Sequence, residues 1–126
     1  MPTTTITDIR TVGVTVTNQD DAIDFYVGTL GFDKVLDAPI SPTMRWVEVA
    51  PAGASTTIAL VAGDGAPGAG AETGIRFTVP DAGAEHTAMS RRGVIIGEVL
   101  RWDGVPPMYT FDDPDGNRYV IVEAVR

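Results

Sequence analysis

The sequence contains no cysteine and a single histidine, and these two scarcities narrow the chemistry open to this chain. Without cysteine there is no disulfide, no thiolate nucleophile and no zinc–sulfur site. Zinc, iron and nickel sites generally need at least two imidazole or thiolate donors, and one histidine cannot supply them. We therefore predict that the protein holds no metal and uses no cofactor.

Positive charge is also scarce. Nine lysines and arginines stand against 17 aspartates and glutamates, which gives a formal net charge of −8. No basic cluster is longer than Arg91-Arg92. The electrostatic field of a protein with this negative net charge repels polyanions, so we expect neither nucleic acid nor an anionic membrane as a partner.

Long hydrophobic runs are absent, and none of the apolar stretches approaches the length needed to cross a bilayer. The first residues, Met1–Thr5, show no basic region followed by an apolar stretch, so we expect no export signal and a cytoplasmic protein. The chain of 126 residues is 44% hydrophobic, which suits one ordinary globular domain with its own core.

The first half of the chain alternates between strand and helix patterns. Residues 10–17 alternate apolar and small side chains and predict a strand, after which Asn18 and two aspartates favour a helix that ends at Gly31. Three further strands are predicted, at Phe32–Leu36, Arg45–Val49 and Thr56–Val61. Residues 63–73 are nearly all small or acidic and are typical of a linker.

The second half repeats this order. A strand is predicted at Gly74–Val79, then a helix from Asp81 to Arg92 that ends at Gly93, which is 62 residues after Gly31. The remaining strands are predicted at Val94–Leu100, Met108–Asp112 and Arg118–Glu123. The sequence therefore predicts an α+β fold of two βαβββ modules, residues 8–62 and 74–125, within a single domain.

Three short motifs resemble those of one known family. They are Ala22–Tyr26 with Leu30-Gly31-Phe32, the helix end Arg91–Val94, and the turn Asp113-Pro114-Asp115-Gly116-Asn117. Together they resemble the vicinal oxygen chelate superfamily of glyoxalase I, bleomycin-resistance proteins and extradiol dioxygenases, over essentially residues 8–125. The resemblance implies sheets curled around a central cleft and, for the bleomycin-resistance branch, an acidic homodimer.

The resemblance also implies four metal-ligand positions, and this sequence fills none of them with a ligand. The positions fall at Thr11, Ala59, Gly74 and Val120, and no neighbour within one residue is a histidine or an acid. The lone histidine, His86, is predicted to be a solvated helix residue. Asp112, Asp113 and Asp115 could in principle hold a hard cation, but turn formation already explains them.

The residues in phase with these positions predict the lining of a pocket. On the third strand we expect Trp46 and Glu48 to face inward, where Glu48 either pairs with Arg76 or binds a polar ligand. Large side chains near Gly104–Pro107, a stretch that forms either a lid or a turn, would grip a flat ligand. The predicted ligand-binding residues are Thr11, Trp46, Glu48, Ala59, Arg76, Trp102, Met108, Tyr109 and Val120.

Several functions fit this pocket. The favoured one is a metal-independent protein that binds an aromatic or cationic antibiotic or metabolite, as the bleomycin-resistance resemblance implies. The alternative is a metal-independent isomerase, lyase or hydrolase in which Glu48 acts as general base, provided that burial raises its pKa. An interaction protein with no small ligand, and a metal enzyme completed by a partner chain, also remain open.

Overall fold

The computed structural model describes residues 2–63 and 70–124. The chain divides into two compact units, Met1–Ala62 and Gly63–Arg126, which we call the first and second modules. The predicted linker falls largely on residues 64–69 and so lies outside the described residues. In the described part of the chain, no helix is long and apolar enough to cross a membrane.

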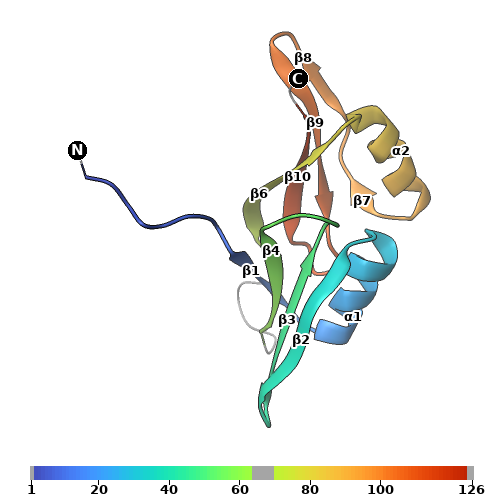
Figure 1. The fold of residues 1–126 in the computed structure, drawn as a ribbon. Coiled ribbons are helices and arrows are strands. Elements are labelled where there is room, and N and C mark those ends of the chain that lie inside the picture. The colour runs from blue at the N-terminus through green and yellow to red at the C-terminus, as the bar shows by residue number, and fades with distance from the viewer. Residues whose placement is uncertain (1, 64–69, 125–126) are drawn as a thin grey trace. The chain divides into compact units, whose positions relative to one another are not determined.

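The first module is a four-stranded sheet with one helical segment, and Figure 1 shows its elements in blue to green. The strand order is β1-β4-β3-β2, with β1 parallel to β4 and the other pairs antiparallel. The elements are β1 (Thr11–Val16), α1 (Gln19–Ile23), η1 (Asp24–Thr29), β2 (Asp33–Ser41), β3 (Met44–Ala50) and β4 (Thr57–Ala62).

The helical segment begins as the sequence predicts but changes its winding. The side chain of Asn18 caps α1 by accepting a hydrogen bond from the backbone N–H of Asp21. After Ile23 the chain continues as the π-helix η1, and the N–H of Leu30 donates to the carbonyl of Phe25 at 2.9 Å. The structure differs from the predicted helix in this wider turn. In a π-helix each N–H donates to the carbonyl five residues back, whereas in an α-helix it donates to the carbonyl four residues back.

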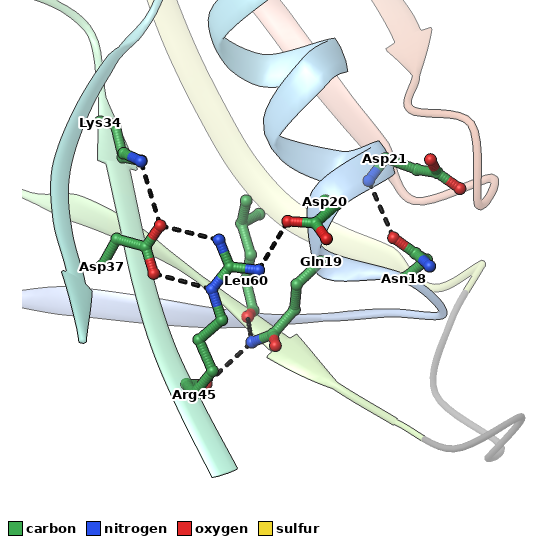
Figure 2. Close-up of polar contacts among 8 residues, drawn as sticks. All are labelled: Asn18, Gln19, Asp20, Asp21, Lys34, Asp37, Arg45 and Leu60. Carbon is green, nitrogen blue, oxygen red and sulfur yellow. Dashed lines mark hydrogen bonds and ion pairs between the residues drawn. The ribbon is translucent and has the colours of Figure 1, made fainter. Parts of the chain in front are cut away.

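A network of charged and polar side chains connects α1 to the sheet, as Figure 2 shows. The Arg45 guanidinium donates from Nε and Nη2 to the two carboxylate oxygens of Asp37, at 2.7 Å each, and from Nη1 to Asp20 at 2.6 Å. The amide of Gln19 donates to the backbone carbonyls of Arg45 and Leu60 at 2.9 Å. Because Arg45 reaches Asp20 on α1, the side chains of β3 in phase with Arg45 point toward the helix.

The Asp37 carboxylate predicts a dependence of stability on pH. The hydrogen bonds from Arg45 and then Lys34 hold the pKa of Asp37 well below its ordinary value of 3.8. A lowered pKa in the folded state adds stability above the ordinary pKa, and this is lost as the pH falls through the folded-state pKa. Asp37→Asn should lower the melting temperature at pH 7 and reduce its fall in acid. The exposed Asp33→Asn should do neither in the same melts.

The second module repeats the topology of the first. The order is β6-β10-β9-β7, β6 is parallel to β10, and β8 pairs with β9. This confirms the predicted α+β fold of two repeated modules. The elements are β6 (Glu72–Val79), α2 (Ala82–Arg91), β7 (Ile95–Ile96), β8 (Leu100–Trp102), β9 (Val105–Asp112) and β10 (Arg118–Glu123).

The strand predicted at Val94–Leu100 is wrong as one element, because it is split into β7 and β8. Gly97 lies between them, and its N–H donates to the carbonyl of Thr110 at 2.9 Å. A Cβ at Gly97 would lie 2.9 Å from the Thr110 hydroxyl, so the chain passes close to β9 and a larger residue at this position would require that side chain to move. Of the Gly104–Pro107 stretch, only Gly104 lies in the turn before β9, because Val105, Pro106 and Pro107 already belong to the strand.

Candidate functional site

The first module has one sheet face turned away from the helix, which we call the first open face. The parallel register places Thr11 beside Thr57 and Gly13 beside Ala59, and the antiparallel register places Glu48 on the other side of Ala59. Paired residues share a face and alternate residues return to it. Trp46 and Glu48 therefore lie on the same face as Thr11 and Ala59, as the sequence predicted.

Glu48 is the charged centre of this face. Its exposed fraction is only 2%, yet both carboxylate oxygens have partners. The Thr57 hydroxyl donates to Oε1 at 2.7 Å, and the Trp46 indole N–H donates to Oε2 at 2.8 Å. The Arg10 guanidinium reaches the same Oε2 at the longer distance of 3.5 Å.

These contacts decide the ionisation of Glu48. The hydrogen bonds from Thr57 and then Trp46 lower its pKa below the ordinary value of 4.5, against the opposing effect of burial. The general-base alternative required burial to raise this pKa, and that condition is not met, because donors to the charged form outweigh desolvation. A carboxylate with a lowered pKa is a weak base, which removes the main condition for the general-base alternative.

Glu48 and Arg76, for which the sequence left open either a mutual pair or binding of a polar ligand, each have hydrogen bonds within their own module. Arg76 is exposed on β6, and its guanidinium donates to the carbonyl of Gly74 at 3.1 Å. In the described part of the chain, the donors to Glu48 are Arg10 directly before β1, Trp46 of β3 and Thr57 of β4. Both oxygens of Glu48 therefore have partners from its own module.

The second module presents a corresponding face, which we call the second open face. Val120 of β10 pairs with Arg76 of β6 and Thr110 of β9, and Val122 pairs with Met108. These pairings place Arg76 and Val120 on one face, as predicted, and add Met108 to the same face. Trp102 lies on the β8–β9 hairpin and is 58% exposed.

Comparisons with known proteins agree with this architecture. The sequence profile of the Glyoxalase/Bleomycin resistance protein/Dioxygenase superfamily matches residues 8–121. The chain belongs to this superfamily.

Solved structures and one curated relative resemble this superfamily member over nearly its whole length. A superfamily member from Sphaerobacter thermophilus DSM 20745 is 35% identical, with a TM-score of 0.87 over 94% of this chain and 98% of that chain. TnmS3, an antibiotic binding protein from Streptomyces sp. CB03234, is 31% identical, with a TM-score of 0.86 over 98% and 100%. The uncharacterised protein YetH of Bacillus subtilis (strain 168) is 32% identical over 94% of this chain and 99% of its own length.

The metal-ligand positions of the superfamily do not fit a metal in this member. The Thr11 hydroxyl donates to the carbonyl of Thr57 at 3.2 Å, and Ala59, Gly74 and Val120 have no donor atom in their side chains. Among the described residues, no group of three histidines or acids lies close enough to hold a metal ion.

The acidic turn of this superfamily member has a structural use. One Asp113 oxygen accepts hydrogen bonds from the backbone N–H groups of Asp115 and Asn117, at 2.9 Å each. The other accepts from the Asn117 amide at 2.9 Å, while Asp112 pairs with Arg118. Hydrogen bonds within the turn and the ion pair with Arg118 therefore account for the contacts of Asp113 and Asp112 without a cation.

Two predictions about aromatic side chains of the second module are wrong. Tyr109 lies beside Met108 in sequence, so it points to the opposite face of β9, where it is 1% exposed and its hydroxyl donates to the Met89 sulfur of α2 at 3.0 Å. His86 is not simply solvated, because its Nε2 bonds the Gly97 carbonyl at 2.8 Å and its ring packs edge-on against Tyr109. Tyr109 belongs to the core between α2 and the sheet, and the half-buried His86 packs against it.

This placement predicts that Tyr109 contributes to stability and not to ligand binding. Tyr109→Phe keeps the ring against His86 and loses the bond to Met89, so the free energy of unfolding should fall by about 1 kcal/mol. Urea unfolding measures the loss, and the affinity for any ligand of the open faces should stay within twofold of the native value. A large loss of affinity at native stability would put Tyr109 back in the binding site.

Proposed function

We propose that this protein binds a small, flat organic molecule against the first open face, without a metal. The observation that carries the proposal is the arrangement of Trp46 beside the buried, ionised Glu48. An aromatic ring with one fixed polar group beside it is the usual composition of a small-molecule site. The resemblance to TnmS3, an antibiotic binding protein, supports an antibiotic or a metabolite of similar shape as the ligand.

Binding is favoured over catalysis because Glu48 has the wrong properties for a base. Both of its oxygens are engaged, and its pKa is lowered, so it would be slow to take a proton from a substrate. A fixed, ionised carboxylate is instead suited to orient a ligand. The expected contacts on this face are Thr11, Trp46, Glu48 and Ala59.

A thermal-shift screen with planar antibiotics and aromatic metabolites tests the proposal. A ligand present at about 100 times its dissociation constant adds roughly 2.7 kcal/mol to the free energy of unfolding and raises the melting temperature. Trp46→Leu should abolish the shift caused by a hit, whereas Trp102→Leu, which removes the other tryptophan of the chain, should retain it.

Two outcomes would count against this site. If Trp102→Leu abolishes the shift and Trp46→Leu does not, the ligand binds the second module, through Trp102. If a hit is consumed during incubation and Glu48→Gln stops the consumption without weakening binding, the protein is an enzyme despite the lowered pKa of Glu48.

We propose in addition that the protein is a homodimer. Val35 and Ile40 are exposed on the edge strand β2, and Met44 is exposed at the start of the adjoining strand β3. Such an apolar sheet edge is commonly covered by another chain. Light scattering during gel filtration should give twice the chain mass of 13.3 kDa. A mass of one chain at micromolar concentration would contradict the dimer.

A further inference from the structure

Arg10 makes an unusual contact with the buried carboxylate. Its backbone is fixed, because its carbonyl accepts a hydrogen bond from the N–H of Thr57 at 3.0 Å. Its side chain is 78% exposed and touches Glu48 only at the tip, at 3.5 Å, where the Glu48 side chain is almost fully buried. The outer side of the carboxylate is therefore reached by one solvated cation.

The contact between Arg10 and Glu48 stabilises Glu48 more than it stabilises Arg10. A carboxylate that is removed from water needs hydrogen bonds and a counter-charge, or its ionised form is costly. A long, exposed arginine at this distance gives up little when it moves away, because water solvates it and salt screens the contact. Arg10 is thus a weak counter-ion for a group that favours a strong one.

Trp46 adds a second attraction for positive charge at the same place. Its indole N–H is held by Glu48 Oε2, the oxygen that Arg10 also contacts, so the ring is oriented beside the carboxylate. The face of an indole attracts organic cations. A flat cation could then stack on the ring and place its charge near Oε2.

We propose that Arg10 is an exchangeable counter-ion, and that the positively charged group of an aromatic ligand replaces it at Glu48. This inference rests on the proposed function and adds the ligand's charge and the residues that select it. The net charge of −8 favours the approach of a cation over that of an anion. An anionic ligand would instead use Arg10 as its partner and would be opposed by Glu48.

Three probes of nearly the same shape separate these possibilities. N-methylacridinium carries a permanent positive charge, acridine is neutral at pH 8, and acridine-9-carboxylate is an anion. Dissociation constants are measured by calorimetry at 50 mM and 300 mM salt. We expect the cation to bind native protein about tenfold more tightly than acridine, with the difference shrinking at high salt.

Two variants and their matched controls identify the residues. Glu48→Gln keeps the size and hydrogen-bonding ability of the side chain and should bring the ratio of the dissociation constants for acridine and its cation close to one. Arg10→Gln removes the competing cation and should tighten N-methylacridinium binding several-fold, with no effect on acridine. Glu98→Gln and Arg91→Gln make the same charge changes at exposed positions of the second module and should alter neither preference by more than twofold.

The outcomes separate this inference from the function on which it rests. If acridine and its cation bind equally, or if Arg10→Gln weakens the cation, the exchange is wrong while small-molecule binding stands. Tighter binding of the carboxylate, lost in Arg10→Gln, would also overturn the exchange and show Arg10 to be an anion receptor. If none of the probes binds below 1 mM, both the inference and the proposed function fail for flat ligands. Arg10 is exposed, so its variant tests the exchange even if Glu48→Gln does not fold.

Discussion

Asn117→Ala is expected to lower the free energy of unfolding by about 3 kcal/mol. Asn117 is completely buried, and its side-chain oxygen accepts hydrogen bonds from the backbone N–H groups of Gly70 and Ala71, at 3.0 and 3.1 Å. Its amide donates to Asp113 at 2.9 Å. Alanine removes all three of these hydrogen bonds, and urea unfolding at pH 7 measures the cost.

Asn117→Asp is the matched variant. It keeps an acceptor for Gly70 and Ala71 but loses the donor to Asp113 and places a second carboxylate against it. It should be as unstable as the alanine variant at pH 7, because the new carboxylate repels that of Asp113. If both variants unfold like the native protein at pH 7, the turn does not hold β6 against β10.

Tyr26→Ala is expected to cost more, about 3 to 5 kcal/mol, because it empties a core position. Tyr26 is fully buried, and its ring meets Phe25 edge-on at 5.3 Å and Phe32 at 6.2 Å between ring centroids. It also lies in the π-helix η1, whose carbonyl at Tyr26 accepts a bond from the N–H of Phe32 at 2.9 Å. Phe25→Ala removes a less buried ring and serves as the comparison.

Thermal melts and circular dichroism of the two variants decide this point. Tyr26→Ala should show no cooperative melting transition above room temperature and a much weaker near-ultraviolet signal than the native protein. Phe25→Ala should still melt cooperatively, at a moderately lower temperature than the native protein. If the two variants lost stability equally, the ring of Tyr26 would contribute no more to the core than the ring of Phe25.

These two residues explain why the family could be identified from the sequence while the ligand could not. Tyr26 belongs to the Phe25-Tyr26 motif and Asn117 to the Asp113–Asn117 turn, and both motifs hold secondary structure together. Strand alternation, helix caps and glycine stops are local signals, so the two modules were predictable from them. A ligand leaves no comparable periodic pattern.

The features that the sequence missed depend on contacts between distant residues or on backbone winding. The contact of Arg10 with Glu48 spans 38 positions, and the lowered pKa of Glu48 follows from donors on neighbouring strands. The π-helix changes the hydrogen-bond partner without changing the apolar pattern enough to be seen. Tyr109 was the avoidable error, because alternation along β9 already separates it from Met108.

The indole N–H signals of the two tryptophans provide the most direct test of ligand binding at the first open face. In a ¹H–¹⁵N spectrum each tryptophan gives one such signal, and Trp46→Phe assigns them. Titration with N-methylacridinium should shift the Trp46 signal saturably, with one ligand per chain, because this N–H donates to Glu48 at the proposed site. A Trp46 signal that stays in place while the probe binds would contradict the account.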